Sequence, residues 1–432
     1  MRLSRPSPPA WTALTWRGPN PRTTSCCAGR FTPSTRGSRR GCSHAMLMPF
    51  CIGFTPPRSG PWRRVMAEPM APESRLKIQQ KIDGVRDRKT AQTVEHITRF
   101  DKTPSQLKAE MDRYVIGQEK GKKVLATAIA YHYRRLGAAL EEAAAQSGGD
   151  VEKALQKVKT PKANILIVGP TGCGKTYTCE VASRLVGVPF VVEDLTKFSE
   201  TGYVGQSTSD ILVDLLVSAG GHTLTAQTGM VYLDEIDKIA SEKTLTKDVS
   251  GKGVQKGLLK MLEGMENTIE FGKDRLTLST RHVLFIAGGA FEGLEEIVQK
   301  RMERLGIKGL WREHLLPDDL VRYGMERQLM ARLPVRVVYN ALTTANLRDI
   351  LTKSEDSPLQ AFIKDFEAWG IRLVFTEEAV LEVARRAEQE GVGARGLTSI
   401  LHRVLLEPMF SLPGTHTGEY EVNAMQVKAA LA

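Results

Sequence analysis

Residues 1–65 lack lysine, aspartate and glutamate altogether, yet they contain eleven of the arginines of this 432-residue chain. The whole chain has 60 basic and 49 acidic residues, so its net charge of +11 comes from this segment and residues 66–432 are neutral. A neutral body has no general field that attracts a phosphate backbone. We therefore expect no nucleic-acid partner.

Long apolar runs are also missing. No stretch of 18 or more apolar residues occurs, so the sequence predicts no membrane-spanning helix and no membrane partner. Cysteine is scarce after residue 65, where only Cys173 and Cys179 occur, as is typical of a reducing compartment without disulfides. We expect a cytoplasmic protein.

The arginine-rich segment 1–65 has no apolar periodicity, and its cysteines form no C-x2-C pair, so we expect neither a fold nor a zinc site there. Two interpretations stay open. Translation begins at Met66 or Met70 and the start is mis-assigned, or the segment is an organellar transit segment, because it is rich in Arg and Ser and free of acids. The second interpretation would place the protein in the mitochondrial matrix.

Apolar runs bounded by turn residues alternate with helical patterns over residues 103–334, after a polar linker at 66–102. This alternation predicts an α/β domain in which helices cover both faces of a parallel sheet. From 335 to 432 helical patterns dominate, which predicts a second, smaller, mostly helical α/β domain. The predicted buried strands of the first domain are 164–168, 190–192, 230–233 and 283–286.

A phosphate-binding motif follows the first of these strands. Its residues are Gly169-Pro170-Thr171-Gly172-Cys173-Gly174-Lys175-Thr176, which match G-x4-G-K-[ST] before a predicted helix. Glycines let backbone N–H groups curl around phosphates, and the helix N-terminus adds the positive end of its dipole. Lys175 would bind the β- and γ-phosphates of ATP, and the Thr176 hydroxyl would complete the coordination of Mg²⁺.

A second motif ends the strand at 230–233 with two carboxylates. Asp234 is placed to hold the Mg²⁺ shell, and Glu235 to orient or deprotonate the attacking water. The two motifs together indicate ATP hydrolysis and not nucleotide binding alone.

With these motifs, the chain resembles the ClpX-type AAA+ unfoldases, and next the HslU type, from about residue 100 to its end. Further segments in the family's order carry the resemblance. They are Tyr114-Val115-Ile116-Gly117-Gln118 (adenine-side box), Gly202-Tyr203-Val204-Gly205 (axial pore loop), 248–255 (second pore loop), Ala331-Arg332-Leu333-Pro334 (arginine finger) and Gly393-Ala394-Arg395-Gly396-Leu397 (sensor 2).

The resemblance implies a hexameric ring with ATP between subunits. It implies that Arg332 reaches the γ-phosphate of a neighbour and that Arg395 senses nucleotide in its own subunit. Tyr203 and Val204 would grip a protein substrate in the central pore, and Val115 and Ile116 would contact the adenine. A Clp-type peptidase is the implied partner, since no nucleophile–base constellation stands out in this chain.

The sequence departs from the ClpX type at five places, one of which is the segment before the arginine finger, where the family's Pro-Glu-Phe-Ile-Gly is replaced by Arg327-Gln328-Leu329-Met330-Ala331. The zinc-binding N-terminal domain and the Ile-Gly-Phe docking loop are not found, and the region 301–316 offers only Leu305-Gly306-Ile307-Lys308-Gly309-Leu310. The Arg-Lys-His loop is reduced to 272–275, and Gly288-Gly289 stands where many AAA+ proteins have a polar sensor 1 residue.

Four functions compete. The leading one is an ATP-driven protein unfoldase that feeds a peptidase, and the second is a stand-alone remodelling chaperone, which the altered docking region favours. An AAA+ nucleic-acid motor is the third, and the neutral body argues against it. The fourth is a nucleotide-gated scaffold without productive hydrolysis, and the intact Lys175, Glu235 and Arg332 argue against it.

Overall fold

The computed structural model describes residues 88–146, 155, 157–158, 162–198, 207–240, 249–271 and 274–432. The arginine-rich segment 1–65 and the pore-loop residues Tyr203 and Val204 lie outside the described residues. No helix in the described ranges combines the length and the apolar character needed to cross a membrane.

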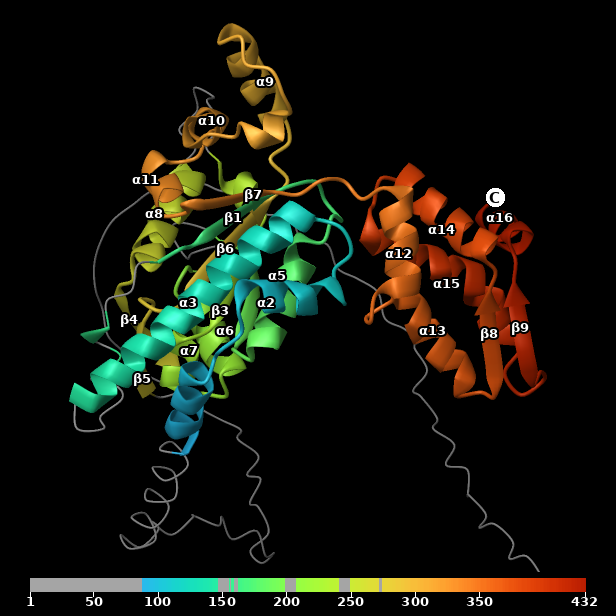
Figure 1. Ribbon diagram of the computed structural model, residues 1–432, viewed down its shortest axis with the longest axis horizontal. Coiled ribbons are helices and arrows are strands. Elements are labelled where there is room, and N and C mark those ends of the chain that lie inside the picture. Colours follow the sequence, from blue (N-terminus) through green and yellow to red (C-terminus); the bar gives the residue numbers. More distant parts are fainter. Residues whose placement is uncertain are drawn as a thin grey trace, which may run out of the picture. The chain divides into compact units, whose positions relative to one another are not determined.

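A five-stranded parallel sheet forms the centre of the N-terminal part (Figure 1). Its strand order is β2-β3-β6-β1-β7, and every neighbouring pair is parallel. The four strands expected from the sequence are confirmed. The fifth, β7, was not expected: it follows Pro334 and pairs with β1. The bounds are β1 Ile165–Val168, β2 Phe190–Asp194, β3 Met230–Asp234, β6 Leu284–Gly289 and β7 Val335–Val338.

Helices cover both faces of this sheet, as the continuous apolar strands require. Successive residues of β1 illustrate this, because Ile165 and Ile167 join one buried cluster and Leu166 and Val168 join the other. One face is covered by α2 (Pro104–Asp112), α3 (Glu119–Gln146) and α5 (Lys175–Val186). The other is covered by α6 (Asp210–Ser218), α7 (Thr223–Gln227), α8 (Val249–Glu263), α9 (Leu294–Arg304), α10 (Pro317–Tyr323) and α11 (Arg327–Ala331).

The start of α2 is fixed by its own sequence. Thr103 caps α2 with a capping box to Gln106, and Pro104 occupies the first turn. Helix α3 continues to Gln146 and buries Leu140 and Ala143. Beyond the sheet, β4 (Glu266–Phe271) and β5 (Asp274–Ser279) form an antiparallel hairpin. Single-turn helices are η1 (Leu195–Lys197), η2 (Ile236–Ile239) and η3 (Trp311–Glu313).

The C-terminal part has its own apolar core, made by helices around one pair of parallel strands. This is the smaller, mostly helical α/β arrangement that the sequence predicts. Its elements are α12 (Thr344–Lys353), α13 (Pro358–Glu367), β8 (Ile371–Phe375), α14 (Glu377–Gln389), α15 (Ala394–Ser411), β9 (Gly418–Val422) and α16 (Ala424–Leu431).

Parallel pairing brings the carboxyl ends of all five strands to one edge of the sheet. The phosphate-binding motif follows β1, the two carboxylates end β3, and the glycine pair ends β6. Ligands of open α/β sheets bind at this edge. The fold therefore gathers the two sequence motifs in one place.

Candidate functional site

The phosphate loop turns directly from β1 into α5, whose first residue is Lys175. The Lys175 side chain is almost fully buried, and its Nζ donates to the carbonyls of Gly169 (2.7 Å) and Pro170 (3.0 Å). These weak neutral acceptors are its only hydrogen-bond partners among the described residues, and no carboxylate pairs with it there. The cation is therefore held at the loop and is available to an anion.

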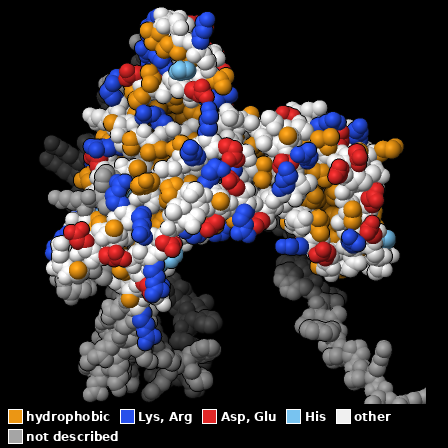
Figure 2. Space-filling model, in the orientation of Figure 1, with side chains coloured by type: hydrophobic (Ala, Val, Ile, Leu, Met, Phe, Trp, Pro, Cys, Tyr) orange, Lys and Arg blue, Asp and Glu red, His pale blue; other side chains and the backbone are white. Residues whose placement is uncertain are grey.

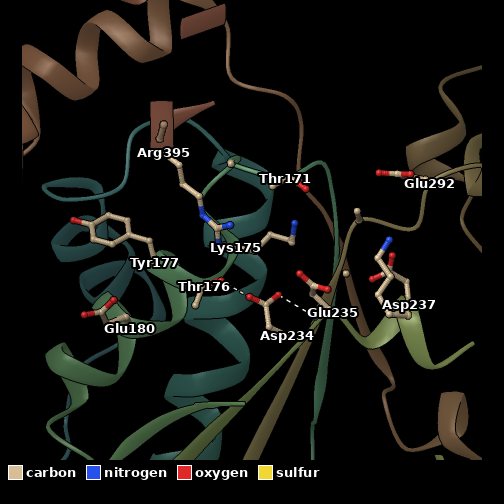
Figure 3. A pocket seen from close by; sticks show the side chains of 16 residues that line it. Thr171, Lys175, Thr176, Tyr177, Glu180, Asp234, Glu235, Asp237, Glu292 and Arg395 are labelled. Carbon is tan, nitrogen blue, oxygen red and sulfur yellow. Dashed lines mark hydrogen bonds between the residues drawn. The ribbon is translucent and has the colours of Figure 1, made fainter. Parts of the chain in front are cut away.

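Thr176 and Asp234 meet at the adjoining strand end. Thr176 Oγ1 donates to Asp234 Oδ2 at 3.2 Å, and the backbone N–H of Glu235 donates to Asp234 Oδ1 at 3.0 Å (Figure 3). Glu235 has a left-handed backbone with φ 55° and ψ 37°, which is unfavourable for a residue with a side chain. This turn leaves its exposed carboxylate at the pocket, beside Asp234.

The two motifs line one pocket of about 320 Å³, a size typical of small-molecule sites. Figure 3 shows Lys175, Thr176, Asp234 and Glu235 converging on it, with Arg395 reaching in from α15. The predicted site residues among its lining are Thr171, Gly172, Gly174, Lys175, Thr176, Asp234, Glu235 and Arg395.

Arg395 comes to the pocket through a backbone contact with the phosphate loop. The N–H of Ala394 donates to the Gly172 carbonyl at 3.0 Å. Gly172 has φ +75°, and a Cβ there would lie 2.2 Å from the Val392 carbonyl oxygen, so only glycine fits. Gly172 therefore allows the backbone at 392–394 to pack directly against the phosphate loop, in addition to allowing the turn of the loop itself.

The adenine-side box lies next to the loop but does not line this pocket. Val115 is buried, and its carbonyl accepts a hydrogen bond of 2.8 Å from Lys122 Nζ, while Ile116 is half-buried. Gln118 donates through Nε2 to the Cys173 carbonyl at 3.3 Å. The box is thus attached to the phosphate loop.

Four further predicted site residues do not line the pocket. The Cys173 side chain is buried in the core between the sheet and α5, and burial raises the pKa of its thiol. Arg332 does not line the pocket and forms an ion pair with Glu263 at 2.9 Å. Gly169 and Pro170 contribute the carbonyls that hold Lys175.

Sequence reasoning missed several lining residues. Asp237, Glu292 and Lys238 also line the pocket. Asp237 follows Asp234 by three residues in the same carboxylate-containing segment, so this segment of the sequence could have predicted Asp237 as a site residue. Its Oδ2 accepts from the Phe291 N–H at 3.1 Å, and its buried Oδ1 has no partner among the described residues. No sequence signal pointed to Glu292.

The residues present fit a nucleoside triphosphate with Mg²⁺. A buried lysine beside a helix N-terminus suits the phosphates. A hydroxyl and a carboxylate already in contact suit Mg²⁺, which prefers oxygen ligands and is held through one or two carboxylates plus phosphates.

Sequence comparisons with known proteins identify the family of this chain. Residues 160–336 match the family model described as the AAA domain (Cdc48 subfamily), and residues 342–422 match the C-terminal, D2-small domain of ClpB protein. The chain is 40% identical over 337 residues to "ATP-dependent Clp protease ATP-binding subunit ClpX 3" of Methylococcus capsulatus, covering 72% of this chain and 76% of that relative.

Two further relatives carry the name "ATP-dependent Clp protease ATP-binding subunit ClpX". The protein of Treponema denticola is 35% identical to this chain, and the match covers 72% of this chain and 77% of the relative. The protein of Bacteroides fragilis is 36% identical, and the match covers 76% of this chain and 81% of the relative. The resemblance drawn from the motifs is confirmed: the chain belongs to the ClpX family of AAA+ proteins.

Proposed function

We propose that this protein is an ATP-dependent protein unfoldase of the ClpX type, which hydrolyses ATP in a hexameric ring. The observation that carries the proposal is the pocket itself, where Lys175, Thr176, Asp234, Glu235 and Arg395 come together from both parts of the chain. We further propose that these parts are separate domains whose boundary falls between β7 and α12, since β7 belongs to the sheet.

Each side chain then has a task. Lys175 binds the β- and γ-phosphates once its contacts to the loop carbonyls are exchanged for them, and Thr176 and Asp234 hold Mg²⁺. When bound, Mg²⁺ neutralises charge that develops on the phosphate oxygens. Glu235, exposed at the pocket, orients the attacking water and accepts its proton.

Two arginines complete the proposed site. Arg395 reads the nucleotide within its own subunit, and its place in the pocket lining supports this. Arg332 lies outside the lining and serves a neighbouring subunit, as a finger supplied in trans. The adenine-side residues Val115 and Ile116 contact the base, and Tyr203 and Val204 contact the substrate polypeptide.

Unfolded protein delivered to a Clp-type peptidase is the proposed outcome. A stand-alone remodeller is the second candidate, because the docking segment is short and part of it is folded onto the core. Ile307 packs against the large apolar cluster, while Leu305 and Leu310 are exposed. On the face shown in Figure 2, Lys and Arg side chains are intermixed with Asp and Glu side chains, so this face does not favour nucleic acid as a partner.

Glu235→Gln tests the proposal. The variant should bind Mg²⁺–ATP with wild-type affinity and hydrolyse it at least about a hundred times more slowly, since a general base contributes about 10²–10⁴-fold. Glu292→Gln is the matched control, because Glu292 is a second carboxylate in the same lining and should be dispensable. Equal effects of the two changes, or normal turnover by Glu235→Gln, would contradict the proposal.

A further inference from the structure

The phenol hydroxyl of Tyr232 is buried close to the Thr176–Asp234 pair. Tyr232 is in β3, two residues before Asp234, and points into the core between the sheet and α5. Its side chain is completely buried, and the hydroxyl makes no hydrogen bond of good geometry among the described residues. The Thr176 side chain lies within hydrogen-bonding reach of it, and Asp234 and Cys179 are near enough to interact with it electrostatically.

A buried hydroxyl without a partner is costly, by about 1–3 kcal/mol. Phenylalanine would fill the same core position without a polar group to bury. The place of this hydroxyl beside the Thr176–Asp234 pair, and not its missing partner alone, points to a hydrogen bond that forms when the site binds its ligand, because the equally unpartnered Tyr339 hydroxyl lies near Thr178 instead.

Gly288 makes room for this oxygen. Gly288 follows Ile286 by two residues in β6, and Ile286 is the register partner of Tyr232. A Cβ on Gly288 would lie 1.8 Å from Tyr232 Oη, so the hydroxyl occupies the space of the missing side chain. The Tyr232 hydroxyl thus fills the space beside the end of β6 where Gly288 has no side chain.

We propose that Tyr232 is a positioning residue for Mg²⁺, whose hydroxyl, in the space left by Gly288, holds Thr176 and Asp234 in the geometry that binds the ion. This inference rests on the proposed function. The contact of 3.2 Å between Thr176 Oγ1 and Asp234 Oδ2 is longer than the roughly 2.5–3.0 Å usual for an O–H···O bond. A phenol O–H can donate to either oxygen, and Mg²⁺ demands near-ideal ligand geometry.

Tyr232→Phe removes only the hydroxyl. Tyr339→Phe is the matched control, because the Tyr339 hydroxyl is equally buried, has no partner among the described residues, and belongs to the same core, but lies near Thr178. Binding of a fluorescent ATP analogue to the full chain is measured without Mg²⁺ and then in a Mg²⁺ titration. Thermal unfolding and steady-state ATPase are measured alongside.

For Tyr232→Phe we expect unchanged binding without Mg²⁺, and a Mg²⁺ concentration for half-maximal binding raised about tenfold or more, as for other groups that orient metal ligands. The kcat should fall with little change in KM. The temperature midpoint of unfolding should not fall, because the variant loses a buried hydroxyl that makes no hydrogen bond of good geometry and so contributes little to stability. Tyr339→Phe should leave the Mg²⁺ dependence unchanged.

An unchanged Mg²⁺ titration for Tyr232→Phe, or an equal shift for Tyr339→Phe, would overturn the inference while leaving the proposed function intact. Wild-type protein that neither binds nor hydrolyses Mg²⁺–ATP would overturn the proposed function and the inference with it. Gly288→Ala is a second variant, since its methyl group displaces the hydroxyl without removing it. It should shift the Mg²⁺ titration in the same direction.

Discussion

Gln118 and Asn340 exchange two hydrogen bonds through one side-chain amide. The Asn340 N–H donates to Gln118 Oε1 at 3.0 Å, and Gln118 Nε2 donates to the Asn340 carbonyl at 2.7 Å. Nε2 also donates to the Cys173 carbonyl of the phosphate loop. One side chain therefore joins the adenine-side box, the phosphate loop and the connection between β7 and α12. Any displacement of the loop acts on that connection.

Gln118→Ala should lower the free energy of unfolding by about 1–3 kcal/mol, because it leaves the bonded backbone groups without this partner. Gln118 has φ +55°, which favours glycine. Gln118→Gly should therefore cost about 1 kcal/mol less than Gln118→Ala. Urea denaturation of both variants measures the difference, and a larger loss for Gly would contradict the explanation.

Arg332 is half-exposed and pairs with Glu263 across the surface. Arg332→Ala should change stability by less than about 1 kcal/mol, as is usual for such pairs. ATP hydrolysis should fall about a thousandfold with nucleotide affinity unchanged, since a finger acts on the transition state. Glu263→Gln, which removes the same ion pair, should spare hydrolysis.

Mixing inactive subunits tests whether Arg332 acts in trans. Rings that combine Arg332→Ala with Glu235→Gln subunits contain seams where an intact Arg332 faces an intact Glu235. Such mixtures should regain activity in proportion to those seams. No recovery in mixtures shown to co-assemble would mean that Arg332 does not act across a seam.

Tyr203→Ala should hydrolyse ATP at close to the wild-type rate but fail to unfold a stable model protein. The physical reason is that an aromatic ring offers bulk to any substrate side chain, and that neighbouring glycines place few steric limits on the backbone. Fluorescence loss of a tagged folded substrate in the presence of a trap measures unfolding. Tyr203→Phe keeps the ring and should retain activity, and unfolding by Tyr203→Ala would exclude the pore role.

The sequence predicted what depends on short contiguous patterns. The buried strands β1, β3 and β6 are apolar runs, and the catalytic motifs follow directly from β1 and β3. The edge strand β7 was missed because Val335-Arg336-Val337-Val338 is only partly buried and follows a proline that suggested a boundary. Its pairing with β1 is a tertiary event that no local pattern reports.

Relationships between distant residues were out of reach for the same reason. Gln118 and Asn340 are 222 residues apart, and Tyr232 faces Gly288 only because β3 and β6 are neighbours in a particular register. The motif supplied Lys175, Thr176, Asp234 and Glu235. The groups that hold them in place became visible only with the packing of the strands.

Glu193 and Asp214 bring two carboxyl groups together between β2 and α6. Glu193 is 7% exposed, and burial, with Asp214 beside it, raises the pKa of Glu193 to about 7 from an ordinary 4.5. Lys197 opposes this shift and Asp210 adds to it, each to a smaller extent. The folded protein therefore holds a proton on Glu193 that the unfolded chain releases.

The contribution of Glu193 to stability should fall as pH rises from about 4.5 to about 7, because the folded state binds more protons in that window. Glu193→Gln keeps the hydrogen-bonding shape without the charge. Its free energy of unfolding should match that of the wild type at pH 5 and exceed it at pH 8 by on the order of 1 kcal/mol, since solvent screens the exposed Asp214. Asp214→Asn should give the same trend by removing the repulsion. Urea denaturation at the two pH values decides the matter, and parallel pH profiles for wild type and Glu193→Gln would show that this carboxyl ionises normally.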